Sequence, residues 1–262
     1  MELRDRTIVI TGAASGIGRA LAERFASEAP RALVLADRTL EPAEQLAATL
    51  GPIATARRTD VGRPEEIEAL VADATDLVGP IDLFVSNAGI GGPGGGPEAP
   101  DDAWDEIWRI NVMAHIWAAR ALVPRMTERG EGYLLSTASA AGLLTQVGAL
   151  PYSVTKHAAV AVAEWLSIMY ADAGLKVSCL CPLGVRTPML EGALDDEGPG
   201  ATALLQDDLL EPADVAEAVV AGLREERFLI LPHDNVARYL ALKGAQPERW
   251  LAGMRKLVRS AR

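Results

Sequence analysis

The sequence has 262 residues, a length that is normal for one α/β domain built on a single large sheet. Hydrophobic residues make up 49% of the chain, which predicts a large core and excludes wholesale disorder. With 25 basic against 36 acidic residues, the formal charge of −11 disfavours partners such as nucleic acid or an anionic membrane surface.

The N-terminal sequence does not indicate export. Residues 1–7, MELRDRT, lack the charge pattern and apolar centre of a signal peptide, and no apolar run is long enough to span a membrane. We therefore expect a cytoplasmic protein. Cys179 and Cys181 alternate in a strand-like run, which predicts structural burial on one sheet face. The histidines form no motif with them, so no metal site is expected.

Short apolar runs alternate with longer amphipathic ones along the chain. The predicted strands cover residues 7–12, 32–37, 54–61, 82–89, 132–139, 176–182 and 228–232. The predicted helices lie between them, at residues 17–27, 41–50, 64–77, 104–126, 152–171 and 214–223. This alternation indicates βαβ units and a mainly parallel sheet with helices on both faces, within one domain spanning residues 1–262.

Three segments depart from this alternation. Residues 89–100 are rich in glycine and proline, which predicts a flexible loop at the carboxyl end of a strand, where open α/β sheets bind ligands. Residues 188–212 are predicted to form a substrate lid, with disorder as the alternative. The amphipathic tail, residues 233–262, ends basic and is expected to form a solvated or self-packing helix, with a partner contact as the alternative.

Tyr152 and Lys156 form the most informative pair in the sequence. Four residues are about one helical turn, so the phenol and the ammonium group project from one helix face. A neighbouring cation is expected to lower the pKa of the phenol toward the range useful for general acid and base catalysis. Ser139 precedes the tyrosine by thirteen residues and supplies a second hydroxyl for the same oxygen of a substrate.

A glycine-rich loop, TGAASGIG, occupies residues 11–18 between the first predicted strand and helix. Gly12, Gly16 and Gly18 would let the backbone approach a pyrophosphate, while the helix N-terminus supplies amide donors and positive potential. Their spacing differs from the common GxGxxG dinucleotide fingerprint, and a tight turn without a ligand is the alternative.

Asp37 ends the second predicted strand, nineteen residues after Gly18. A carboxylate there can accept hydrogen bonds from an adenine-side ribose, and its charge repels a ribose 2′-phosphate. The sequence therefore predicts NAD rather than NADP, although Arg38 is placed to attract that phosphate. A surface pair of Asp37 and Arg38 without cofactor contact is the alternative.

The glycine loop, the NAG sequence at Asn87–Gly89, Asn111, Ser139 and the YSVTK sequence at Tyr152–Lys156 together resemble the short-chain dehydrogenase/reductase family. The resemblance covers essentially the whole chain. It implies a doubly wound Rossmann-type sheet of seven mainly parallel strands and a nicotinamide cofactor. Assembly into a homotetramer or dimer through the helices that contain Asn111 and Tyr152 is usual in this family.

The resemblance also implies a role for each matching catalytic position. Tyr152 would donate or accept the proton, and Lys156 would adjust its pKa and bind the nicotinamide ribose. Ser139 would hold the carbonyl oxygen, and Asn111 would anchor a water that links Lys156 to solvent.

The cofactor-binding residues that the resemblance implies run along the whole cleft. Asp60 and Val61 match the adenine contacts, and Pro182, Val185 and Thr187 match the segment that positions the nicotinamide amide. The full set is Gly12, Ser15, Gly16, Ile17, Gly18, Asp37, Arg38, Asp60, Val61, Asn87, Ala88, Gly89, Tyr152, Lys156, Pro182, Val185 and Thr187. The chain departs from the family at one point, because Leu183 follows Pro182 where the family usually has glycine.

These observations predict an NAD-preferring oxidoreductase that acts on a secondary alcohol or ketone. Hydride can leave a carbinol carbon only if the hydroxyl proton also leaves, so a base beside that oxygen is required. The expected pocket residues are apolar and favour a lipophilic substrate: Leu143, Leu144, Val147, Leu150, Met189 and Leu190. Hydrophobic packing under the lid explains the same residues equally well, and Arg186 leaves an anionic substrate as an alternative. Two alternatives remain, a non-catalytic cofactor-binding scaffold and a dehydratase or epimerase that uses NAD transiently.

Overall fold

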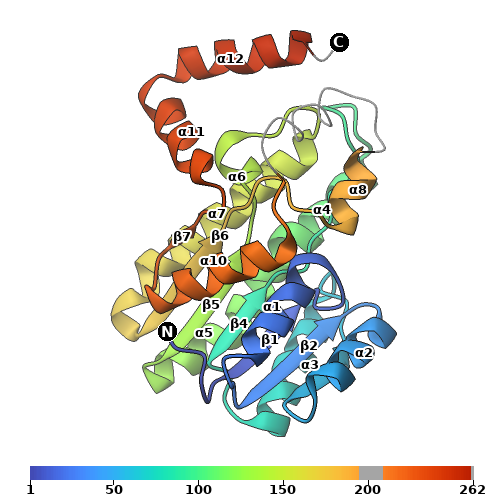
Figure 1. Cartoon of the computed structure of the whole chain (residues 1–262), viewed down its shortest axis with the longest axis vertical. Helices are drawn as coiled ribbons and strands as arrows, with labels where there is room; N and C mark the ends of the chain where they lie inside the picture. The colour runs from blue at the N-terminus through green and yellow to red at the C-terminus, as the bar shows by residue number, and fades with distance from the viewer. Residues whose placement is uncertain (195–208, 261–262) are drawn as a thin grey trace.

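A computed structural model describes residues 1–194 and 209–260 of the chain, which form one seven-stranded sheet (Figure 1). The strands are β1 (Thr7–Thr11), β2 (Ala32–Asp37), β3 (Ala54–Arg58), β4 (Leu83–Ser86), β5 (Gly132–Thr137), β6 (Leu175–Leu180) and β7 (Leu229–Ile230). Their order is β3-β2-β1-β4-β5-β6-β7, and every pairing is parallel. Successive strands are added on one side of β1 up to β3 and on the other side from β4 onward. The gap between β1 and β4 is therefore the topological switch point, where ligands bind in such folds.

Helices cover both faces of the sheet. They are α1 (Gly16–Ala26), α2 (Leu40–Leu50), α3 (Pro64–Val78), α4 (Asp101–Trp108), α5 (Ala114–Arg129), α6 (Ala141–Leu144), α7 (Leu150–Tyr170), α8 (Pro188–Leu194), α10 (Pro212–Arg224), α11 (Asp234–Ala245) and α12 (Pro247–Ser260). Side chains of α3, α5 and α7 form one hydrophobic cluster on the sheet, and those of α1, α2 and α10 form a second cluster on the opposite face. The predicted α/β architecture is therefore confirmed.

The predicted helix at residues 104–126 is not continuous in the structure. It is divided into α4 and α5 by a π-helical turn, Arg109–Met113, at which the buried Asn111 faces the loop after β4. Such one-residue insertions into a helix re-aim a side chain and are common at functional sites. The short helix α6 was not predicted.

Cys179 and Cys181 lie on one face of β6, as predicted. Both are fully buried, and their Sγ atoms are 3.8 Å apart without a disulfide. They belong to the core cluster beneath α7, which confirms their structural burial.

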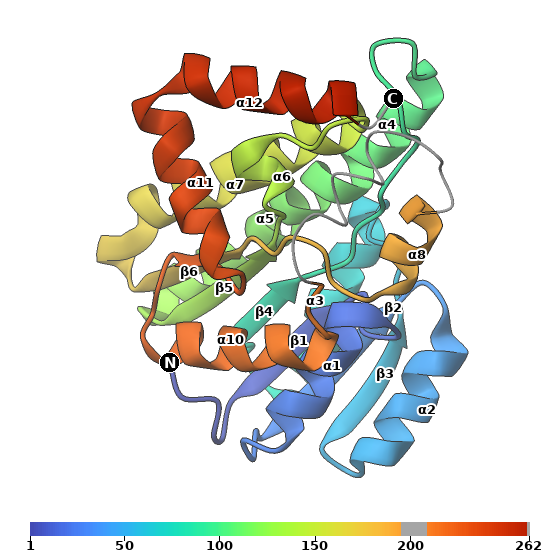
Figure 2. The ribbon, with the colours of Figure 1, turned by 45° about the horizontal axis from the view of Figure 1, so that its top comes forward.

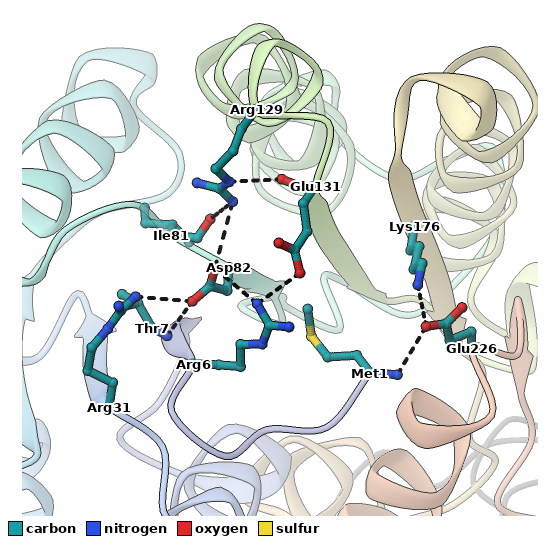
Figure 3. Close-up of polar contacts among 10 residues, drawn as sticks. All are labelled: Met1, Arg6, Thr7, Arg31, Ile81, Asp82, Arg129, Glu131, Lys176 and Glu226. Carbon is teal, nitrogen blue, oxygen red and sulfur yellow. Dashed lines mark hydrogen bonds and ion pairs between the residues drawn. The ribbon is translucent and has the colours of Figure 1, made fainter.

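The amino ends of the strands are joined by a polar network around Asp82, which Figure 3 shows. Its carboxylate accepts hydrogen bonds from the backbone N–H of Thr7 at 2.8 Å and from Arg31 at 3.2 Å. Arg6 and Arg129 lie 3.6 and 3.8 Å from the other carboxylate oxygen. This network is at the end of the sheet opposite to the glycine loop.

In the segments that were singled out as lid and tail, the described residues form α8, α11 and α12. The start of the predicted lid forms α8, and residues 195–208 lie outside the described residues. The tail forms two helices, α11 and α12, where one was expected; α11 lies beside α6 (Figure 2). None of the helices within residues 1–194 and 209–260 is both long enough and apolar enough to cross a bilayer.

Candidate active site

The glycine loop connects β1 to α1 at the switch point of the sheet. Gly12 and Gly16 have φ angles of 64° and 52°, which favour glycine. At Gly18 an added Cβ would lie 2.0 Å from the Gly12 carbonyl oxygen, so only glycine fits. Ser15 precedes the helix without a side-chain cap, and the first turn of α1 carries no acidic residue. Its amide groups are therefore available to an anion, as a pyrophosphate site requires.

Asn87 and Thr11 hold the glycine loop against the end of β4. The Asn87 amide nitrogen donates to the carbonyl oxygens of Thr11 and Gly12, at 3.0 and 3.3 Å. The Thr11 hydroxyl oxygen accepts from the backbone N–H groups of Asn87 and Ala88, at 3.0 and 3.1 Å. Thr11 was missed as a site residue, although its place at the carboxyl end of β1 is a positional signal. Together these bonds fix the spacing between the two loops.

Asp37 lies beside the glycine loop, as its position at the end of β2 implied. Its carboxylate accepts hydrogen bonds from the backbone N–H groups of Ala14 and Thr39, both at 3.0 Å. Each carboxylate oxygen retains a second acceptor position. Arg38 is exposed. The carboxylate thus supports the loop backbone and places a negative charge beside the glycine loop.

The third strand brings Asp60 and Val61 to the same edge of the sheet. The Asp60 side chain accepts from Gly62 N at 2.9 Å and lies 3.5 Å from the Arg63 guanidinium, while Val61 is buried. The backbone N–H of Thr59 donates to the Asp37 carbonyl oxygen at 2.8 Å, which joins the two strand ends.

Ser139 follows β5 and contacts the loop after β6. Its Oγ accepts from Ala141 N at 3.1 Å and donates to the Pro182 carbonyl oxygen at 3.5 Å. It also hydrogen-bonds to the Tyr152 phenol. Its hydroxyl therefore lies at the junction of three elements, β5, α7 and the segment that follows β6.

Lys156 and Tyr152 project from the first two turns of α7. The Lys156 ammonium group is buried, donates to the Thr137 carbonyl oxygen at 3.0 Å, and lies 5.6 Å from the centroid of the Tyr152 ring. Burial lowers the pKa of Lys156 from 10.5 to about 8, with the Cys179 and Cys181 thiols acting in the opposite direction.

The expected depression of the Tyr152 pKa is wrong for this structure. Burial raises the pKa of the phenol above 10.0, and the hydrogen bond from Ser139 only partly opposes this rise. The cation does not reverse the shift because its own charge is destabilised by burial and its ammonium group is directed at Thr137. The phenol is thus protonated near neutral pH and is poised to act as an acid.

Asn111 uses its side chain to hold the loop after β4. Its amide nitrogen donates to the Ile90 carbonyl oxygen and its amide oxygen accepts from Ile90 N, both at 2.9 Å. A weaker bond reaches the Thr155 hydroxyl at 3.4 Å. A Cβ added at Gly89 would lie 3.2 Å from Asn111 Oδ1 and 3.4 Å from Lys156 Nζ, so Gly89 fills the space between them. A role for Asn111 in anchoring water stays a prediction.

The segment after β6, residues 182–187, is called the β6 loop. Its Thr187 side chain approaches the glycine loop, because a Cβ added at Gly16 would lie 3.1 Å from Thr187 Cγ2. The Thr187 hydroxyl donates to the Val185 carbonyl oxygen at 3.2 Å, and the Pro182 carbonyl oxygen accepts from Ala140 N at 2.8 Å. The β6 loop therefore lies between the glycine loop and Ser139.

His115 is a buried residue near the site that the sequence analysis did not single out. It is 4% exposed, and within the described part of the chain neither ring nitrogen has a hydrogen-bond partner. Burial, assisted by the charge of Lys156, lowers its pKa to about 3, so the ring is neutral near neutral pH. Its position one helical turn after Asn111 is a signal that could have been used.

The six apolar residues expected to line a pocket differ in exposure, and Val147 is half-buried. Leu143, Leu144 and Leu190 are buried, and the first two belong to the core. Leu150 and Met189 are 36% and 43% exposed. A Cβ added at Gly91 would lie 3.8 Å from the Met189 side chain, so α8 borders the loop after β4. In the described ranges no group of three or more acidic, histidine or cysteine side chains is arranged to hold a metal ion.

Comparison with known proteins agrees with this geometry. A family model described as short chain dehydrogenase matches residues 6–198. The chain belongs to the short-chain dehydrogenase/reductase family. It is 37% identical over 265 residues to the 1-deoxy-11-beta-hydroxypentalenate dehydrogenase of Streptomyces exfoliatus. The alignment covers 95% of this chain and 94% of the relative.

Solved short-chain dehydrogenase/reductase structures share the whole fold. One from Burkholderia phymatum in complex with NAD is 31% identical, has a TM-score of 0.85, and covers 95% of this chain and 96% of its own. A short-chain dehydrogenase from Sphingobium yanoikuyae in complex with NADPH is 27% identical, with a TM-score of 0.80, and covers 93% and 94%. A nicotinamide cofactor is thus common to both structures, in two different forms.

Proposed function

We propose that this chain transfers a hydride between a nicotinamide dinucleotide, NAD in preference to NADP, and a lipophilic secondary alcohol or ketone. The observation that carries the proposal is the meeting of Ser139, Tyr152 and Lys156 at the carboxyl end of β5. Binding a dinucleotide does not require a proton donor, so this set favours turnover over a scaffold role.

The loops at the switch point fit the cofactor. Gly18 lets α1 pack directly against the Gly12 carbonyl and the Asn87 side chain, and the uncapped first turn of α1 offers amide donors to a pyrophosphate. Asp37 would accept hydrogen bonds from the adenine-side ribose, and its charge favours a 2′-hydroxyl over a 2′-phosphate. Pro182, Val185 and Thr187 would border the nicotinamide end.

A bound nicotinamide ring supplies or accepts the hydride. In ketone reduction, Tyr152 donates its phenolic proton to the carbonyl oxygen, and Ser139 donates a hydrogen bond to the same atom. The raised pKa of the phenol suits this direction at neutral pH. Lys156, with a pKa of about 8, can return a proton to the tyrosine oxygen between turnovers. In alcohol oxidation the proton moves the opposite way.

Two exposed apolar side chains support the proposed substrate class. Leu150 and Met189 present exposed apolar surface on α7 and α8, and Arg186 at the mouth pairs with Glu211 at 3.0 Å. The related dehydrogenase from Streptomyces exfoliatus is named for a hydroxypentalenate. These observations support a lipophilic alcohol or ketone.

We further propose that the chain forms a homodimer or homotetramer through α4, α5 and α7. Trp165, Ile168 and Met169 on α7 are 54%, 71% and 56% exposed, and Trp108 on α4 is 41% exposed. Apolar side chains gathered on adjoining helices are typical of subunit interfaces. Light scattering on the wild type and on Ile168→Glu tests this assembly.

Absorbance of reduced nicotinamide, followed with a panel of secondary alcohols and ketones, tests the function. We expect turnover by the wild type and a loss of at least about 10²-fold in Tyr152→Phe, which keeps the ring and removes the proton. Turnover that survives Tyr152→Phe would contradict the mechanism. A wild type that binds NADH but turns over no alcohol or ketone would instead support the scaffold alternative.

A further inference from the structure

His233 lies at the carboxyl end of β7 and is 7% exposed. Its ring holds the β6 loop through both nitrogens. Leu183 N donates to Nδ1 at 3.2 Å, and Nε2 lies 3.2 Å from the Gly184 carbonyl oxygen. Because a backbone N–H only donates and a carbonyl only accepts, these contacts assign the neutral tautomer with its proton on Nε2.

The two bonds restrain the peptide units at the point where the chain departs from the usual Pro-Gly of its family. The Leu183 side chain packs against the core cluster, and the Gly184 carbonyl oxygen also accepts from Leu210 N at 3.2 Å. Glycine in place of Leu183 would leave the backbone freer to turn. In this chain the backbone at Leu183 and Gly184 is instead held by the imidazole of His233.

The restrained loop is directly connected to the reacting groups. On its amino side, the Pro182 carbonyl oxygen accepts from Ala140 N at 2.8 Å and from the Ser139 hydroxyl at 3.5 Å. On its carboxyl side, Val185 and Thr187 lead to the contact with the glycine loop. A shift of the Leu183–Gly184 peptide would therefore move the nicotinamide end of the cleft and leave the adenine end in place.

We propose that His233 is a positioning residue that fixes the nicotinamide-binding part of the β6 loop, an inference that rests on the proposed function. The alternative is that the imidazole stabilises the fold without affecting where the nicotinamide ring is held. The two readings differ in which half of the dinucleotide is affected. Positioning affects only ligands that carry the nicotinamide, whereas a loss of fold affects all of them.

The test compares NADH with ADP-ribose, which lacks the nicotinamide ring, by calorimetric titration of the wild type and of His233→Phe. Phenylalanine keeps a flat ring and removes both bonds. We expect the Kd for NADH to rise about tenfold, as the loss of two neutral hydrogen bonds implies, and the Kd for ADP-ribose to stay within about twofold. If the Kd values for NADH and ADP-ribose rise by the same factor, or if neither rises, the proposal is overturned.

Two further variants separate the bonds and guard against misfolding. His233→Gln places an amide N–H where Nε2 stands, and His233→Asn places a carbonyl oxygen near the position of Nδ1, so each is expected to restore part of the NADH affinity. Asp234→Asn, at the exposed neighbouring position, is the matched control and should leave both Kd values unchanged. If neither His233→Gln nor His233→Asn binds NADH more tightly than His233→Phe, the assigned bonds are contradicted.

Hydrogen exchange without cofactor gives a readout that does not depend on turnover. In the wild type the Leu183 amide should exchange slowly, and in His233→Phe the peptide covering residues 181–187 should exchange faster than residues 11–18 do. Unchanged exchange would overturn the proposal. A wild type that binds neither NADH nor ADP-ribose would contradict the proposed function, while the exchange result would still decide whether His233 holds the loop.

Discussion

The Nζ atom of Lys156 lies 3.0 Å from the carbonyl oxygen of Thr137. This bond ties the helix that carries the candidate proton donor to the carboxyl end of β5. It satisfies one donor of the buried ammonium group, yet burial still lowers the pKa to about 8. The lysine therefore acts as a group whose charge state changes close to physiological pH.

Replacing Lys156 with methionine should change how stability depends on pH. The unfolded lysine binds its proton up to about pH 10.5, whereas the folded one releases it near pH 8, so the wild type gains stability relative to Lys156→Met as pH rises through this window. The gain should reach up to about 3 kcal/mol. Urea unfolding without cofactor measures it, and Lys176→Met, at an exposed lysine paired with Glu226, is the control. Parallel pH curves for wild type and Lys156→Met would contradict the shift.

His115 should make the fold sensitive to acid. Its folded pKa of about 3 lies below the usual 6.5, so the unfolded chain takes up a proton first and stability is lost as pH falls from about 6.5 to about 3. His115→Leu should remove up to about 5 kcal/mol of this loss. Above pH 7, the difference in free energy of unfolding between His115→Leu and the wild type should stay constant. If the free energy of unfolding falls equally in both proteins as pH is lowered from about 7 to about 3, the His115 ring takes up its proton in the folded state as readily as in the unfolded chain.

Ser139→Ala should slow turnover and shift its pH profile. The hydrogen bond from Ser139 lowers the Tyr152 pKa, so its removal leaves burial unopposed and raises that pKa further. We expect alcohol oxidation to require higher pH and kcat to fall by roughly 10²-fold. Steady-state oxidation measured between pH 7 and 10 checks both effects. A lower kcat with an unshifted profile would limit Ser139 to holding the substrate.

Asp37→Asn should relax the choice between NAD and NADP. The amide keeps an oxygen that can accept from Ala14 N, so the glycine loop is retained while the charge that repels a 2′-phosphate is removed. We expect the ratio of kcat/KM for NADP to that for NAD to rise roughly tenfold, which corresponds to about 1.4 kcal/mol. Arg38→Ala should lower the same ratio. A ratio unaffected by either change would place the ribose away from this pair.

Gly18→Ala should abolish dinucleotide binding. The new methyl group would lie 2.0 Å from the Gly12 carbonyl oxygen and 2.6 Å from the Asn87 amide nitrogen, which forces the glycine loop to move. Gly253→Ala in α12, where no atom lies within 4 Å of the new Cβ, is the matched control and should add up to about 1 kcal/mol of stability. Calorimetric titration with NADH distinguishes them. Near-normal affinity in Gly18→Ala would contradict the tight packing of this loop.

The strands and most helices were predictable because their apolar periodicity is strong and the turns between them contain glycine. The one-turn spacing was sufficient to place Tyr152 and Lys156 on one helix face, and the family resemblance implied that Ser139 acts beside them. The π turn around Asn111 was not predictable, since it depends on bonds to Ile90, which lies twenty-one residues earlier in the sequence. Periodicity within a window contains no information about such a partner.

Electrostatic detail was also beyond the sequence. The one-turn spacing of Tyr152 and Lys156 indicated a lowered phenol pKa, but the sign depends on burial, which the structure shows to dominate. The same limitation applies to His233, whose ring meets Leu183 only because β6 and β7 are adjacent in the sheet. Residues that act across adjacent strands need the topology before their roles can be inferred.

Asp82, with arginines from three different segments directed at its carboxylate, fastens the strands at the end of the sheet remote from the phenol. The polar network that stabilises the sheet and the candidate site therefore lie at opposite ends of the same strands. Under the proposed function, we expect substitutions in residues 89–100 or in α8 to alter which substrate is accepted without loosening this anchorage. Such a division allows one scaffold to acquire new substrates while its thermal tolerance is preserved.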